Sequence, residues 1–131
     1  MGFRQWLVDH GWGILPVYVG QQTSGPGSHE VNGSQGMRDG TNAAALASNE
    51  GFPKGTSIYV DVEDGSALSR DAAAYLTYWA KGVIAGGHAP AFYCSYRIAP
   101  SVAALATTVG PARPLRIWPF SEDDGRPSLY G

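Results

Sequence analysis

Short apolar runs recur along the chain and predict the strands of a sheet. The runs at 14–20, 57–63, 91–95 and 115–118 are rich in branched and aromatic residues, which suit a pleated surface. Pro16 interrupts the first run, but proline is tolerated at the beginning of a strand or beside a bulge. The pattern therefore predicts four strands.

Between these runs, apolar residues return every three or four positions, which is the spacing of a helix with one buried face. Ser69 is expected to cap one such helix, and Asp39 or Thr41 another. Short polar side chains at these positions accept hydrogen bonds from the free N–H groups of the first turn. The expected helices span residues 3–10, 39–50, 69–85 and 100–108.

The alternation of strand and helix predicts βαβ units and a parallel sheet whose strands are adjacent in chain order. A closed (β/α)8 barrel needs about 200 residues or more, whereas this chain has 131. We therefore expect a single α/β domain over residues 1–131. It would be a partial TIM-barrel-like sheet of four to five strands, truncated at both ends. The polar, glycine-rich segment 21–36 is expected to form a long loop at its mouth.

Two acids interrupt the second apolar run. Asp61 and Glu63 stand two residues apart, so on a strand their side chains share a face. Burying charge without a partner is costly, which favours a functional reason for acids in a central strand. Gly65 ends the run and puts Glu63 near the carboxyl end of the strand, where parallel α/β folds bind ligands. The alternative is that both acids reach solvent or cap the next helix.

Composition excludes several classes of partner. A net charge of −2 without a Lys/Arg cluster argues against nucleic acid, and no apolar run approaches the roughly 20 residues of a membrane span. Cys94 is the single cysteine, and it stands in an apolar run where burial is expected. His10, His29 and His88 are scattered, and no glycine motif for phosphate is present. We therefore expect neither a metal nor another cofactor.

Aromatic residues are plentiful, with seven tyrosines and four tryptophans. Their rings suit sugar binding as well as core packing, and core packing remains the alternative for each tyrosine. Gln21 and Gln22 follow the first predicted strand, and their side-chain amides suit hydrogen bonds to sugar hydroxyls. The alternative is that they are ordinary polar residues at the beginning of a loop. The candidate ligand-binding residues are Tyr18, Gln21, Gln22, Tyr59, Tyr93 and Trp118.

An ordered set of motifs covers residues 11 to 96 and carries a family resemblance. The set resembles the glycoside hydrolase-like domain family once known as DUF1906, which is related to the family 25 lysozymes (muramidases). The matching segments are Gly11-Trp12, Leu15-Pro16-Val17-Tyr18-Val19-Gly20-Gln21-Gln22, Asp39-Gly40, Gly51-Phe52-Pro53-Lys54-Gly55-Thr56, Ile58-Tyr59-Val60-Asp61-Val62-Glu63 and Phe92-Tyr93-Cys94-Ser95.

The resemblance implies a TIM-like barrel with the Asp-x-Glu pair at its mouth and a glycosidase that acts on cell-wall glycan, namely peptidoglycan. Glu63 would then be the general acid, and Asp61 the partner that orients substrate or stabilises charge. We expect Glu63 to be the less solvated carboxyl, with a raised pKa. The resemblance also implies an extracellular or cell-wall location, although no signal peptide begins this chain. The family's first strand carries a further aspartate, upstream of residue 1.

Two other readings remain open from the sequence. The domain could be a catalytically inactive carbohydrate-binding module with the same cleft, or a fragment that self-associates through an exposed sheet edge. A second carboxyl group across the cleft would favour catalysis. A separation of roughly 5–5.5 Å would predict retention of configuration, and roughly 6.5–9.5 Å inversion.

Overall fold

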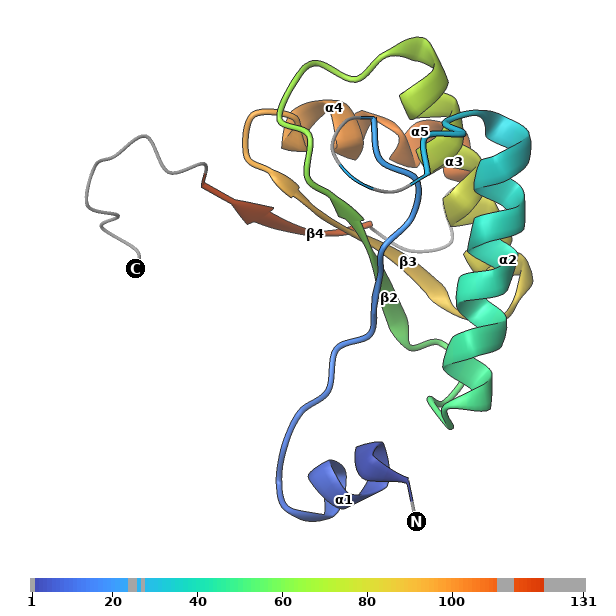
Figure 1. Cartoon of the computed structure of the whole chain (residues 1–131), viewed down its shortest axis with the longest axis vertical. Coiled ribbons are helices and arrows are strands. Elements are labelled where there is room, and N and C mark those ends of the chain that lie inside the picture. Colours follow the sequence, from blue (N-terminus) through green and yellow to red (C-terminus); the bar gives the residue numbers. More distant parts are fainter. Residues whose placement is uncertain (1, 24–25, 27, 111–114, 122–131) are drawn as a thin grey trace.

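A parallel four-stranded sheet organises the chain (Figure 1). The computed structural model describes residues 2–23, 26, 28–110 and 115–121. All neighbouring strands pair in parallel and in chain order, which confirms the predicted sheet. The strands are β1 (Val17–Tyr18), β2 (Ser57–Val62), β3 (Ala89–Ser95) and β4 (Arg116–Phe120).

The first strand is much shorter than the predicted run 14–20. Pro16 has no backbone N–H to give to a neighbouring strand, although its carbonyl oxygen accepts a hydrogen bond from the N–H of Tyr59 at 3.0 Å. Regular pairing then continues only through Val17 and Tyr18. The edge of the sheet at β1 is therefore short.

Five helices accompany the strands in the described part of the chain. Ser69 caps α3 as predicted, and its hydroxyl accepts a hydrogen bond from the N–H of Ala72 at 3.1 Å. The predicted helix at 100–108 is divided into two short helices at Leu105. The helices are α1 (Phe3–Asp9), α2 (Gly33–Asn49), α3 (Arg70–Ala85), α4 (Ala99–Ala104) and α5 (Ala106–Val109).

The predicted start of α2 was wrong. Asn32 caps this helix, because its side-chain oxygen accepts a hydrogen bond from the N–H of Gln35 at 2.8 Å. The helix therefore begins at Gly33, inside the segment 21–36 that was expected to be loop. Asp39, which was expected to cap the helix, lies in its interior and is buried.

Glycines bring α2 and α3 unusually close. A Cβ atom at Gly36 would lie 2.2 Å from the carbonyl oxygen of Tyr75, and one at Gly40 would lie 2.0 Å from that of Trp79. On the other helix, a Cβ at Gly82 would lie 2.8 Å from the Met37 carbonyl oxygen. No side chain fits at such distances, so only glycine allows this backbone contact.

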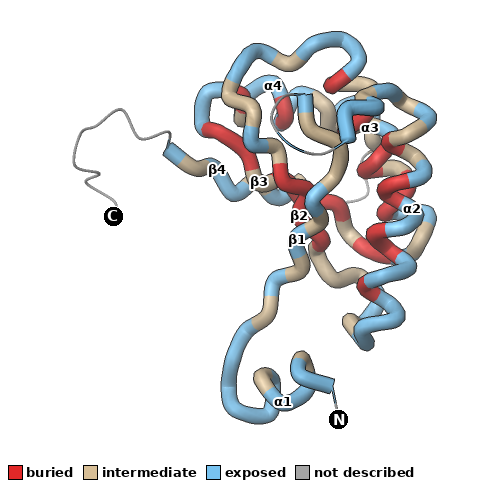
Figure 2. The backbone as a smooth tube through the Cα atoms, viewed as in Figure 1, coloured by how far each residue is buried: buried red, intermediate tan, exposed pale blue. Residues whose placement is uncertain are grey.

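The sheet has one face packed against helices. Ile58 and Val60 of β2 and Phe92 and Cys94 of β3 belong to the buried core together with Trp79 of α3. Figure 2 shows this buried layer running through α2, α3, β2 and β3. Burial of Cys94 confirms the reading of that residue as a small apolar core side chain.

The first helix lies apart from this core (Figure 1). None of its residues is buried, and Figure 2 shows it exposed along most of its length. Arg4 connects it to the body, because its Nε donates a hydrogen bond to the carbonyl oxygen of Glu50 at 2.6 Å. Within the described residues, no helix is both long enough and apolar enough to cross a membrane.

The close contact of α2 and α3 can be tested with one added methyl group. Gly40→Ala should destabilise the fold by about 2–3 kcal/mol, because overpacking at a rigid backbone contact forces the helices apart. Gly33→Ala is the matched control: its Cβ would meet only the half-exposed side chain of Tyr78, at 2.9 Å. Urea unfolding of both variants measures the difference. Equal stability of the two would contradict the glycine contact.

Candidate functional site

The face of the sheet opposite the helices presents a row of chemically useful side chains. Asp61 of β2 pairs in register with Tyr93 of β3, and Tyr93 pairs with Trp118 of β4. Paired residues on adjacent strands project from the same face. The structure therefore aligns three of the predicted site residues side by side, toward the carboxyl end of the sheet.

Aromatic rings are in contact along this face. The ring centroids of Tyr93 and Trp118 lie 4.9 Å apart, and those of Tyr59 and Trp118 lie 6.2 Å apart. Phe120 extends the group, with its ring 4.9 Å from that of Tyr93. We call Tyr59, Tyr93, Trp118 and Phe120 the aromatic row. Sequence reasoning missed Phe120, although it stands two residues after Trp118 on the same strand.

Asp61 is buried beside the aromatic row, with 9% of its surface exposed. Its Oδ1 atom is enclosed and has no hydrogen-bond partner among the described residues. The pKa of Asp61 is raised to about 6. The main cause is burial, and a hydrogen bond with the Glu63 carboxyl group and repulsion by the charge of Glu63 add to it. Near and below that pH, Asp61 therefore holds a proton that an ordinary aspartate would have lost.

The expected order of burial in the acid pair was wrong. Glu63 is exposed, and Asp61 is the carboxyl removed from water. The reason is that β2 ends at Val62, so Glu63 already belongs to the loop, while Asp61 remains between two neighbouring strands. The pair is nevertheless in contact, since Glu63 hydrogen-bonds to Asp61 and repels it electrostatically.

Tyr18 does not join the aromatic row. It pairs in register with Val60, which faces the helices. Its ring lies 6.4 Å from that of Trp79, and its hydroxyl accepts a hydrogen bond from the side chain of Asn42 at 3.2 Å. Burial raises the pKa of Tyr18, with a lowering contribution from Asn42 and a raising one from Asp39. Its role is packing between sheet and helices.

Gln22 lies next to the acid pair. Its side-chain amide donates a hydrogen bond to the backbone carbonyl oxygen of Asp61 at 3.0 Å. Gln21 instead points into a buried network, where its backbone N–H donates to the Tyr75 hydroxyl at 3.0 Å. The two glutamines therefore lie in different environments, and it is Gln22 that hydrogen-bonds to Asp61.

The network around Asp39 was not predicted. The Tyr75 hydroxyl donates a hydrogen bond to Asp39 at 2.5 Å, and the side chain of Gln35 donates another at 2.7 Å. Burial and the Asp39 carboxylate strongly raise the pKa of Tyr75. This network joins α2, α3 and the segment after β1, so it fixes the position of Gln21 and Gln22 at the mouth.

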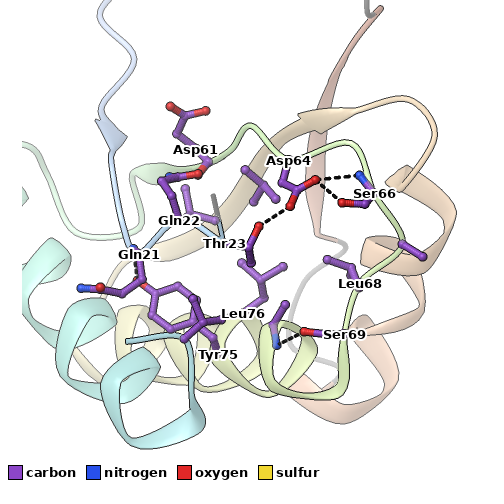
Figure 3. A pocket seen from close by; sticks show the side chains of 15 residues that line it. Gln21, Gln22, Thr23, Asp61, Asp64, Ser66, Leu68, Ser69, Tyr75 and Leu76 are labelled. Atoms are coloured by element: carbon purple, nitrogen blue, oxygen red, sulfur yellow. Dashed lines mark hydrogen bonds between the residues drawn. The ribbon is translucent and has the colours of Figure 1, made fainter. Parts of the chain in front are cut away.

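A cavity of about 190 Å³ opens behind the end of β2, between the loop after β1 and the beginning of α3. Figure 3 shows Asp64 beside it, hydrogen-bonded to Thr23 and Ser66. These bonds lower the pKa of Asp64. In the same view the carboxyl group of Asp61 points away from Tyr75 and Leu76. Asp61, Gln21 and Gln22 nevertheless line the cavity as well, so the cavity adjoins the acid pair.

Metal binding has no support in the described part of the chain. No group of three or more His, Cys, Asp or Glu side chains gathers there in a way that could hold an ion.

Comparison with known proteins adds a family to this geometry. The family model described as "Rv2525c-like, glycoside hydrolase-like domain" matches residues 3–123. No curated protein matches the chain. An uncharacterized protein of B. stearothermophilus with a solved crystal structure is similar in fold, with a TM-score of 0.59 and 19% identity. The similarity covers 96% of this chain and 61% of that one, so the chain spans about three fifths of its length.

The burial of Asp61 predicts a specific dependence of stability on pH. The pKa of Asp61 is raised in the folded state. Its stabilising contribution to the free energy of unfolding is therefore present in full below about pH 4 and is lost as the pH rises through about 6. Asp61→Asn should therefore raise the free energy of unfolding at pH 7 by about 1–2 kcal/mol and leave it unchanged near pH 3.5. Urea unfolding across pH 3.5–8 measures this.

Asp64→Asn is the matched control for that experiment. Hydrogen bonds lower the pKa of Asp64 in the folded state. The pH dependence of its contribution to stability is therefore opposite to that of Asp61: Asp64 stabilises the fold at neutral pH, and this stabilisation is lost as the pH falls below about 4. The control should gain no stability at pH 7. A similar gain from both substitutions would show a general charge effect instead.

Proposed function

The chain belongs to the Rv2525c-like glycoside hydrolase-like domain family, and from this premise we propose that it acts on cell-wall glycan as a glycosidase. The observation that carries the proposal is the acid pair next to the aromatic row. Asp61 and Glu63 are in contact, one buried and one exposed. Glycoside cleavage needs a carboxyl group that protonates the leaving oxygen and a second carboxylate across the sugar, and the contacting pair supplies the first of these.

The two carboxyl groups have different roles in this proposal. Asp61 holds the shared proton at rest, because burial favours its neutral form. Glu63 is exposed at the mouth, where a glycosidic oxygen can approach it. The proton reaches the leaving oxygen through Glu63 as general acid, and Asp61 is its partner. Because the pKa of Asp61 is raised to about 6, this proton is lost and activity falls as the pH rises above about 6.

The aromatic row supplies the binding surface. A pyranose ring has an apolar face that packs against aromatic side chains, while its hydroxyls stay available for hydrogen bonds. Trp118 is half exposed and in ring contact with Tyr93 and Tyr59. Gln22, at the carbonyl of Asp61, offers an amide to sugar hydroxyls on the other side of the acid pair. We propose peptidoglycan as the glycan because of the family's relationship to the family 25 lysozymes.

A second function is favoured by one observation. Along the described strands, the residues that share the face of Asp61 on β1, β3 and β4 include no other carboxylate: they are Val17, Ala89, Ala91, Tyr93, Ser95, Arg116, Trp118 and Phe120. An acid across the cleft would activate water or attack the sugar. Without one, the same surface would serve as a carbohydrate-binding module.

Glu63→Gln separates these two functions. If the domain hydrolyses glycan, the amide keeps the shape but removes the proton donor, and turnover should fall by about 100-fold or more. Binding should persist, because the amide still forms hydrogen bonds. Turnover and affinity are measured side by side on peptidoglycan fragments, with the exposed loop substitution Glu30→Gln as control. Equal turnover in wild type and Glu63→Gln would exclude Glu63 as the acid. Binding without turnover in any variant would favour the binding module.

The aromatic row is tested by affinity. Trp118→Ala should weaken binding of peptidoglycan fragments by about tenfold, since it removes a large ring from the proposed platform. Tyr96→Ala is the control, because Tyr96 is equally exposed, 52% against 51% for Trp118, but lies in the turn after β3. Isothermal titration calorimetry provides both affinities. An equal loss in both variants would contradict the assignment of this face.

A further inference from the structure

The cavity behind the end of β2 has an apolar part and a polar part. Val60 and Leu76 line it and are almost fully buried. Asp64 and Gln22 also line it and are half-buried, and Thr23 is exposed. Figure 3 shows Leu76 projecting from α3, with Thr23 and Asp64 on the side of the loops. The cavity is therefore apolar at its inner end and polar where it meets solvent, a combination that is common in ligand sites.

The size of the cavity limits its occupant. Sites that enclose a drug-sized molecule measure roughly 300–1,000 Å³, whereas this cavity measures about 190 Å³. It therefore suits one small group rather than several sugar rings. Because its inner end is apolar, that group should carry an apolar end of its own, such as a methyl group, which is removed from water there. A bare hydroxyl group would leave the apolar lining unfilled.

The polar part of the lining can accept one hydrogen bond and donate another. One carboxylate oxygen of Asp64 accepts the N–H and the hydroxyl of Ser66, and the other accepts the hydroxyl of Thr23. Each carboxylate oxygen can accept about two hydrogen bonds, so among the described residues the second oxygen retains room for one donor. These bonds also lower the pKa of Asp64, which keeps its carboxylate ionised at neutral pH. Gln22 uses one amide N–H on the carbonyl oxygen of Asp61, and its second N–H can donate to a ligand.

We propose that this cavity binds a small acylamino group, that is, an amide with an apolar end the size of a methyl group. The N–H of the amide donates to Asp64, and its carbonyl oxygen accepts from Gln22. The apolar end lies against Val60 and Leu76. An amide is the neutral group that presents a donor and an acceptor side by side. A carboxylate of similar size would instead be repelled by the charge of Asp64.

The position of the cavity connects its occupant to the acid pair. Gln22 lines the cavity and hydrogen-bonds to Asp61. Glu63 stands in the chain between Val62 and Asp64, which both line the cavity. A glycan held here by an acylamino group therefore lies next to Glu63, so the inference rests on the proposed function and names its substrate class. Peptidoglycan carries such amides on its amino sugars and in its peptides, and these two sources need separate probes.

Two tetrasaccharides test the amino sugar as the source. Chitotetraose and cellotetraose have the same backbone linkage, but only chitotetraose carries acetamido groups. Isothermal titration calorimetry of the wild type should show about tenfold tighter binding of chitotetraose. Leucine at position 67 or 72, both of which line the cavity, adds bulk there, so Ala67→Leu and Ala72→Leu should abolish this preference. Ala73→Leu, on the same helix as Ala72 but outside the cavity lining, is the matched control and should keep it. Ala67 is exposed, so its substitution leaves the core intact even if Ala72→Leu does not fold.

N-acetylalanine methylamide tests the peptide as the source. If the peptide supplies the acylamino group, an NMR titration with this probe should shift the backbone amide signals of the residues that line the cavity. The shifts should appear in the wild type and in Ala73→Leu, and they should be absent in Ala67→Leu. Cavity-dependent binding of either probe supports the proposal and identifies the source.

Two results would overturn the proposal. One is equal affinity for both tetrasaccharides together with no binding of the peptide probe. The other is binding of either probe that persists unchanged in Ala67→Leu and Ala72→Leu, because the cavity would then not be the site. If neither tetrasaccharide binds at all, the proposed function fails, and the peptide probe alone decides whether the cavity binds an acylamino group.

Discussion

The rest of the structure depends on the close contact between α2 and α3. Gly36 and Gly40 let the two backbones approach within distances that no side chain permits, and this puts the Tyr75 hydroxyl within 2.5 Å of Asp39. The same hydroxyl accepts the backbone N–H of Gln21. One helix contact therefore fixes the end of β1, and through it the mouth beside Asp61. A larger residue at either glycine would move all of these groups together.

The acid pair derives its properties from the end of a strand. Asp61 lies within β2, between two neighbouring strands. Glu63 follows the end of this strand and is exposed. The two acids are therefore placed in different solvent environments: removal from water raises the pKa of Asp61, whereas Glu63 stays exposed. The pair is costly for folding at neutral pH, as a functional group in a sheet often is.

The sequence predicted the strands, their parallel order and the shared face of Asp61 and Glu63, because all three follow from local periodicity and chain order. It did not predict which acid is buried, since that depends on where pairing with β3 ends. Tyr18 was wrongly assigned to the ligand-binding residues, because it pairs with Val60 and therefore faces the helices. The sequence of a single strand does not determine its register with the neighbouring strand. The role of Asp39 was missed because its partner Tyr75 is 36 residues away.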